Sequence, residues 1–83
     1  MNAELQTRIT ALLESTIQDS SGRDVTLEAE TPLLDSGYLD SLTLLRVLVE
    51  LQEAFGVELD VGDLTEESFA TPQAVAELVE ARL

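Results

Sequence analysis

The stretch DSLTLLRVLVELQEAFG, residues 40–56, contains the clearest helix of the 83-residue chain. Its apolar side chains recur at the spacing of an α-helix, and Asp40 has the residue type and the place of a helix N-cap. Gly56 follows the last apolar residue, where helices commonly end in the left-handed conformation. These signals predict a helix over residues 41–55.

The apolar side chains of this helix fall on two faces when they are placed at about 100° per residue. The first face predicts contact with the core and consists of Leu44, Val47, Leu48, Leu51 and Phe55. The second lies roughly opposite and consists of Leu42, Leu45 and Val49, interleaved with Arg46, Gln52 and Glu53. A helix in a small bundle needs only the first face. We therefore expect the second face to contact a partner, with burial under residues 33–39 as the alternative for Leu42.

Two further helices are predicted on either side of this one. Residues 3–18 carry an apolar stripe at helical spacing, with Asn2 as a candidate N-cap and Gly22 as the stop. Near the other end of the chain, the pair Thr71-Pro72 gives an N-cap followed by proline at the first helical position. A helix with an apolar stripe follows it, formed by Val75, Leu78 and Val79.

The segments between these helices carry weaker signals. Residues 23–40 show no sustained period and predict a long loop, pinned to the core by Val25, Leu27, Leu33 and Leu34. TEES, residues 65–68, has the form of a short capped turn, with Phe69 after it as an apolar anchor. Together the elements predict one all-α domain over residues 1–83. It is a four-helix bundle of three main helices and one short helix, with a long loop between the first and second helices.

The composition excludes several kinds of function. The chain has no Cys and no His, which removes disulfides, zinc sites built from those residues and the usual general base. Its net charge of −13, with four arginines and no lysine, disfavours nucleic acid and anionic membranes and favours basic partner surfaces. No apolar run is long enough to span a bilayer, and the N-terminus has no signal-peptide core, so we expect a cytoplasmic protein without a metal site.

Two Asp-Ser pairs lie five positions apart, Asp35-Ser36 and Asp40-Ser41. A nucleophilic serine needs a base, which this chain does not offer, so neither pair predicts catalysis. Ser41 opens a helix after a long loop, where its hydroxyl is accessible to another enzyme and an attached phosphate would meet the helix N-terminus. On propensity alone, Ser41 is a capping residue. Ser36 precedes Gly37 and is typical of a turn.

The sequence DSGYLDSLTLL, residues 35–45, followed by ELQEAFGVEL, residues 50–59, resembles the acyl carrier protein family. In that family Asp-Ser-Leu opens the second helix, and its serine carries 4′-phosphopantetheine through a phosphodiester. The resemblance covers nearly the whole chain and implies a bundle of the acyl-carrier type. It implies that Ser41 is the attachment site and that Asp40 is recognised by the transferase. It also implies a partner-binding face made of Leu42, Leu45, Arg46, Val49 and Glu53.

The resemblance implies a carrier rather than an enzyme. A phosphopantetheinyl transferase would attach the arm, an adenylating enzyme would load an acyl or aminoacyl group as a thioester, and acyltransferases, condensing or tailoring enzymes would receive it. The reactive thiol would then lie on the arm, which agrees with the absence of cysteine. We expect the carrier to be a monomer.

The branch of the family is indicated by a few positions. Fatty-acid carriers place acidic residues along the exposed side of the second helix, where this chain has Thr43, Arg46 and Gln52 and keeps Glu53. LLDSGYLDSL and the later ESF are closer to D-alanyl and stand-alone aminoacyl or peptidyl carriers. We therefore expect a free-standing carrier in a natural-product pathway. The alternatives are a fatty-acid or polyketide carrier and, from another class, an acidic interaction module without a prosthetic group.

Overall fold

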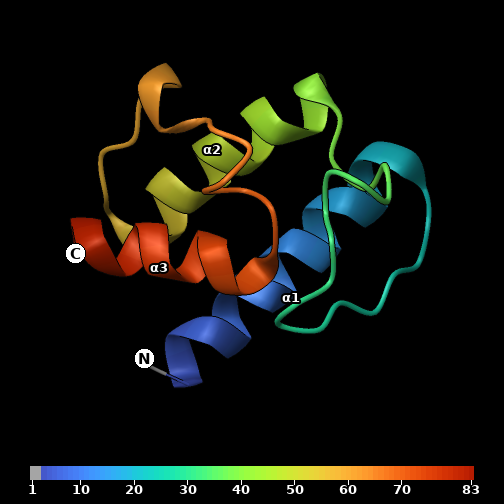
Figure 1. The fold of residues 1–83 in the computed structure, drawn as a ribbon, viewed down its shortest axis with the longest axis horizontal. Helices are drawn as coiled ribbons and strands as arrows, with labels where there is room; N and C mark the ends of the chain where they lie inside the picture. Colours follow the sequence, from blue (N-terminus) through green and yellow to red (C-terminus); the bar gives the residue numbers. More distant parts are fainter. Residues whose placement is uncertain (1–2) are drawn as a thin grey trace.

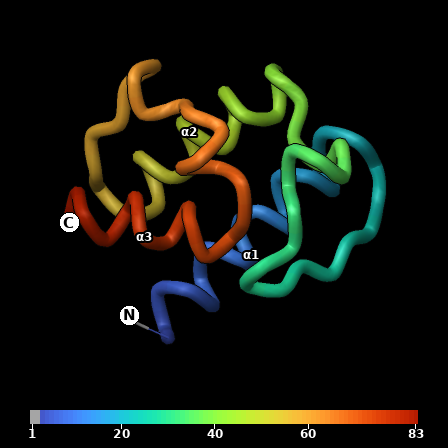
Figure 2. Tube along the Cα trace, viewed as in Figure 1, coloured from blue at the N-terminus to red at the C-terminus, as the bar shows by residue number. Residues whose placement is uncertain are grey.

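The computed structural model describes residues 3–83, and this part of the chain is helical without a β-strand. Three α-helices, α1 (Ala3–Ser21), α2 (Ser41–Phe55) and α3 (Pro72–Arg82), are accompanied by a short 3₁₀ helix, η1 (Val61–Asp63). α1 packs against both α2 and α3 (Figure 1). The long loop leaves the end of α1, passes the start of α3 and returns to the start of α2, as the tube in Figure 2 shows. The predicted all-α fold of the acyl-carrier type is confirmed.

The ends of the helices follow the capping signals of the sequence. The backbone N–H of Thr43 donates to Asp40 Oδ1 (2.8 Å), and Gly56 adopts φ 65° with its N–H bonded to the carbonyl of Gln52 (3.0 Å). At α3 the hydroxyl of Thr71 accepts from the backbone N–H of Ala74 (3.1 Å). The predicted bounds of α2 are confirmed, as is the start of α3.

The end of α1 differs from the prediction. The helix continues to Ser21, whose hydroxyl donates to the carbonyl of Ile17 (2.7 Å), and it stops at Gly22 with φ 73°. The last turn of the helix contains serines and no apolar residue. The apolar stripe therefore ends at residue 17, one turn before the helix does. Asn2, the candidate N-cap, lies outside the described residues.

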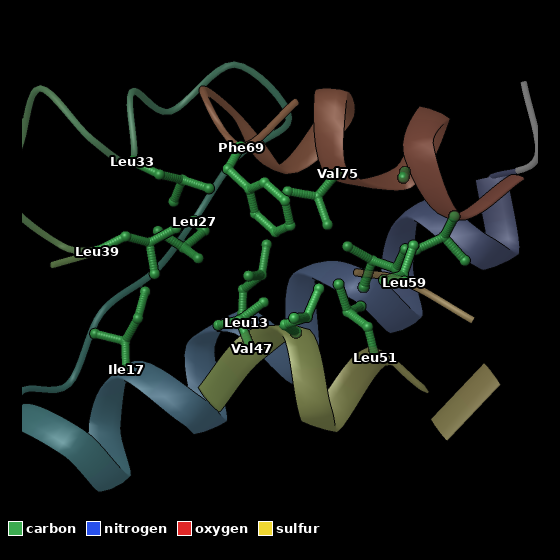
Figure 3. Packing of buried hydrophobic residues seen from close by; sticks show 14 of the residues in the cluster. Leu13, Ile17, Leu27, Leu33, Leu39, Val47, Leu51, Leu59, Phe69 and Val75 are labelled. Carbon is green, nitrogen blue, oxygen red and sulfur yellow. The ribbon is translucent and has the colours of Figure 1, made fainter. Parts of the chain in front are cut away.

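The core lies where the three helices and the long loop meet, and Figure 3 shows its side chains converging. The residues that are almost inaccessible to solvent include Ile9, Leu13, Ile17, Leu33, Val47, Leu51, Phe69, Val75 and Val79. Of the first face predicted for α2, three residues are buried, whereas Leu44 and Phe55 are only partly buried. Thr43, placed on the exposed side by analogy with fatty-acid carriers, is buried instead. It lies four residues before Val47 and therefore on the core side of the helix.

The long loop is fastened to the bundle at several points. The carboxylate of Glu14 in α1 accepts from the backbone N–H of Leu27 (2.8 Å). The N–H of Leu33 donates to the carbonyl of Ala70 (2.8 Å), and the N–H of Leu39 donates to the carbonyl of Leu33 (3.1 Å). Leu27 and Leu33, two of the predicted anchors, are buried. Leu39 is buried as well, although no pattern in the sequence predicted it as an anchor. The loop is thus an ordered part of the fold.

The segment between α2 and α3 places its short helix earlier than predicted. η1 covers Val61–Asp63, whereas the TEES segment forms a single hydrogen-bonded turn. In that turn the Thr65 hydroxyl accepts from the N–H of Ser68 (3.0 Å), and the Thr65 carbonyl accepts from the N–H of Phe69 (3.2 Å). The turn was predicted correctly as a capped unit, and it directs Phe69 into the core.

Candidate functional site

Ser41 is the first residue of α2, and it is exposed. The preceding Asp40 has an extended backbone (φ −99°, ψ −178°), so the chain turns into the helix between these two residues. The Asp40 side chain reaches over the first turn to Thr43, and its carbonyl accepts from the N–H of Leu44 (2.9 Å). This cap places Ser41 in the first turn of α2, at the positive end of the helix dipole.

The same cap alters the acidity of Asp40. Hydrogen bonds from Thr43, chiefly its backbone N–H, lower the pKa of the Asp40 carboxyl, and a backbone contact with Leu42 adds to the effect. Because these donors stabilise the charged form, the carboxylate beside Ser41 stays ionised to lower pH than an unperturbed aspartate. Asp40 therefore presents a fixed negative charge next to the serine hydroxyl.

The second face of α2 is open to solvent. Leu42 is 80% exposed, and Leu45 and Val49 are about half exposed at 47% and 49%. The alternative that Leu42 is buried beneath residues 33–39 is therefore wrong. Leu42, Leu45 and Val49 form an apolar stripe that runs along α2 from the position after Ser41; we call it the α2 stripe. Glu53 is exposed further along the same helix.

Arg46 borders the α2 stripe but is held by the end of α1. Its Nη2 lies 3.6 Å from Asp19 Oδ2, and its Nη1 donates to the hydroxyl of Ser20 (3.4 Å). The sequence did not reveal these two partners, because 26 residues separate Ser20 from Arg46 and nothing in their pattern couples them. The contact neutralises part of the positive charge beside the stripe.

The other three arginines also make contacts within the chain. Arg8 lies over the ring of Phe55 (4.7 Å to the centroid), and Arg23 lies over the ring of Tyr38 (5.2 Å). Arg82 pairs with Asp63 and donates to the carbonyl of Glu58 (3.4 Å). Each of the four arginines of this acidic chain thus contacts another side chain, although all four are exposed.

Two residues that were placed on the exposed side of α2 serve the fold instead. Thr43 is buried, and the side-chain oxygen of Gln52 accepts from the backbone N–H of Leu59 (3.0 Å), which ties the segment after α2 to the helix. Only Arg46 of the three non-acidic substitutions is therefore a surface feature. Arg46 and the α2 stripe alone therefore distinguish this surface from the docking face of fatty-acid carriers.

Ser36 has a different environment from Ser41. Its hydroxyl donates to the carbonyl of Leu33 (3.2 Å) and accepts from the N–H of Tyr38 (3.4 Å), inside a turn that Gly37 completes with φ 80°. The hydroxyl is therefore used within the loop, and no helix begins at Ser36.

Residues 7–79 match the family described as phosphopantetheine attachment site. The chain belongs to this family. It is an acyl carrier protein, and it bears 4′-phosphopantetheine as a covalent group. The alternative of an interaction module without a prosthetic group is therefore set aside. The fit is physical as well: the described chain offers an exposed serine hydroxyl at a capped helix N-terminus, where backbone N–H groups favour a phosphate.

Several curated relatives of this carrier are similar in sequence and in length. D-alanyl carrier protein 2 of Lactiplantibacillus plantarum is 33% identical over 67 residues, which cover 81% of this chain and 84% of the relative. D-alanyl carrier protein 1 of the same organism is 34% identical over 70 residues, covering 84% and 88%. The D-alanyl carrier protein of Enterococcus faecalis is 33% identical over 66 residues, covering 78% and 85%. The carrier lies near the D-alanyl carrier proteins, as its sequence indicated.

Two kinds of feature are absent from the described residues. Within residues 3–83, no helix combines the length and the apolar character that a bilayer crossing requires. The same residues contain no cluster of three or more metal-ligating side chains.

Proposed function

We propose that Ser41 carries the phosphopantetheine arm and that the transferase recognises Asp40 beside the Ser41 hydroxyl. The observation that supports this choice is the contrast between the two serines. The Ser41 hydroxyl is exposed at the start of α2, whereas the Ser36 hydroxyl is bonded inside its own turn. A transferase needs a hydroxyl that it can approach together with a metal-bound coenzyme A. The ionised Asp40 carboxylate beside Ser41 suits such a metal.

The cargo that we propose is an amino acid, held on the arm as a thioester after activation by a separate adenylating enzyme. The similarity to D-alanyl carrier proteins supports a small aminoacyl group, D-alanine among the first candidates. The natural-product pathway stays a prediction, because these relatives are D-alanyl carrier proteins. A fatty-acid or polyketide cargo is the competing outcome of the loading experiment below.

Partner enzymes are proposed to dock on the α2 stripe, with Arg46 and Glu53 beside it. The stripe exposes apolar area next to the arm, and the fold does not use it. A loading enzyme and a receiving acyltransferase, condensing or tailoring enzyme would meet the same surface in turn. We propose that the carrier acts as a monomer in the cytoplasm, since each visit needs the stripe uncovered.

The attachment site is tested by incubating the purified carrier with coenzyme A, Mg²⁺ and a broad-specificity phosphopantetheinyl transferase, followed by intact mass measurement. The carrier and its Ser36→Ala variant should each gain one phosphopantetheine, and Ser41→Ala should gain none. Modification of Ser41→Ala, or its loss in Ser36→Ala alone, would contradict the assignment.

The cargo is tested on the modified carrier with a panel of amino acids and fatty acids and the corresponding ligases. We expect thioester formation with small amino acids, detected as a mass gain that hydroxylamine removes. Preferred loading with long fatty acids would overturn the aminoacyl proposal and leave the attachment site standing.

A further inference from the structure

An open groove lies between the long loop and the segment before α3. It has a volume of about 850 Å³. Its lining includes the apolar residues Pro32, Leu34 and Ala70 and the acidic residues Asp35, Glu66 and Glu67. The site described above does not include any of these residues.

The groove is preformed because both of its walls are anchored. The N–H of Leu33 bonds to the carbonyl of Ala70, which joins the walls directly. Below this bond the fully buried side chains of Leu33 and Phe69 extend toward one another from the two walls (Figure 3). The capped turn that begins at Thr65 then fixes the segment that carries Glu66 and Glu67. A ligand would meet this groove without first having to order it.

The charge of the groove selects its ligand. Three acidic residues line it, and none of the four arginines of the chain is among its lining residues. Each of those arginines is engaged elsewhere, as described above. An ammonium group with a small apolar body is therefore the complementary occupant, and a carboxylate or phosphate is repelled.

The groove also lies within reach of the proposed attachment site. The bond between Leu39 and Leu33 folds the end of the loop back onto its middle, and Ser41 follows Leu39 by two residues. The Cα atoms of Ser41 and Leu34 are therefore separated by at most about 18 Å, from standard backbone dimensions. An extended phosphopantetheine chain has a comparable length.

We propose that this groove holds the aminoacyl end of the carrier's own arm, with the free ammonium of the amino acid among Asp35, Glu66 and Glu67 and its side chain against Leu34 and Ala70. The inference rests on the proposed function, because it requires an aminoacyl cargo tethered at Ser41. A shallow open groove binds a free amino acid weakly. The tether supplies an effective concentration in the millimolar range, so weak binding suffices for occupancy.

As a consequence, a carrier without a bound partner enzyme would distinguish its cargo by charge. A loaded amino acid is drawn back to the protein, whereas an acyl group of the same size without an amine stays in solvent. A partner that docks on the α2 stripe then has to withdraw the cargo from the groove. Because the pairing is exposed, it is screened by salt, over a Debye length of about 8 Å at physiological ionic strength.

The test compares two arms attached to Ser41 by the transferase from coenzyme A analogues. One ends in a hydrolysis-resistant D-alanyl amide and the other in the neutral lactyl amide, which differ only in amine against hydroxyl. Backbone amide shifts are recorded by NMR for both. We expect the D-alanyl arm, and not the lactyl arm, to shift the amides of Leu34, Asp35 and Ala70. The amine pKa should also rise by about 0.3–0.5 unit, since nearby carboxylates favour the charged form.

A charge-matched pair of variants provides the control. Glu66→Gln/Glu67→Gln should abolish the difference between the arms and the rise in the amine pKa. Glu77→Gln/Glu80→Gln removes the same charge from exposed positions on α3 outside the groove lining and should preserve both effects. Equal shifts with both arms, or shifts confined to residues beside Ser41, would overturn the groove proposal alone. Failure of the transferase to attach either arm would overturn the proposed function with it.

Discussion

Two single alanine variants in α2, Leu51→Ala and Leu45→Ala, distinguish the role of the buried face of that helix from the role of its exposed face. Leu51 is fully buried, whereas Leu45 is 47% exposed, and both lie in the interior of the same helix. Replacing each by alanine removes the same atoms. The two variants therefore differ only in what those atoms contact, namely the core in one case and solvent or a partner in the other.

The expected magnitudes follow from the burial. Leu51→Ala should lower the free energy of unfolding by about 2–5 kcal/mol, because a cavity is left in addition to the lost burial. Full burial of a leucine stabilises by about 1.5–3 kcal/mol. Only about half of Leu45 is buried, so Leu45→Ala should cost about 1 kcal/mol. In a domain of this size each kcal/mol shifts Tm by roughly 4–8 °C.

Activity should change in the opposite order. Leu45→Ala removes part of the α2 stripe and should lower kcat/KM of the loading enzyme roughly 5- to 30-fold, equivalent to about 1–2 kcal/mol of docking energy. Leu51→Ala should load at nearly the unaltered rate at a temperature where it is folded. Urea denaturation and initial loading rates measure the two effects. Equal destabilisation by both variants would refute the face assignment, and unaltered loading of Leu45→Ala would refute docking on the stripe.

Three further changes test other contacts. Val49→Asp should leave the fold intact and lower Tm by only about as much as Leu45→Ala, since about half of Val49 is exposed, while it weakens loading; loss of folding would show that Val49 belongs to the core. Asp40→Asn keeps a side-chain oxygen that can cap Thr43 and should stay folded, but it should be less stable than the parent protein to urea at neutral pH and should slow phosphopantetheine transfer; equal stability of the two proteins at neutral pH would show that the charge does not contribute. Because capping lowers the folded-state pKa of Asp40, the charge contributes stability above the unfolded value of about 3.9, and the advantage over Asp40→Asn should vanish as pH falls through the lower folded value. Glu14→Ala should expose the amide of Leu27 to hydrogen exchange and cost about 1–3 kcal/mol, since that donor loses its partner; unchanged protection of Leu27 would show that the bond does not hold the loop.

The helices could be predicted wherever a local signal marked both ends. Asp40 and Gly56 act within one turn of the residues that they cap, so the bounds of α2 followed from the sequence. The start of α3 followed in the same way from Thr71 and Pro72. Ser41 stood out because its position relative to a capped helix can be read from the chain.

The features that were missed depend on contacts between distant segments. The carboxylate of Glu14 and the amide of Leu27 meet across a loop without any period, and no pattern in the sequence pairs Arg46 with the end of α1. Thr43 was misplaced because it was assigned to the exposed side by analogy with fatty-acid carriers, although its spacing of four residues from Val47 puts it on the core side, where it is buried. The groove joins two segments about 30 residues apart and has no sequence signature at all.

The engagement of all four arginines within the fold affects how partner enzymes find this carrier. At long range an approaching enzyme experiences a predominantly negative field, because the chain has 17 acidic residues against four arginines and each arginine contacts another side chain of the fold. Such a field accelerates the encounter but gives little information on orientation. The orientation of the bound enzyme must therefore be determined at short range, by its apolar contact with the α2 stripe. Added salt should then lower the association rate of carrier and enzyme. The dissociation rate depends on a small apolar contact and should stay nearly constant. Each complex is therefore short-lived enough for the carrier to pass from one enzyme to the next.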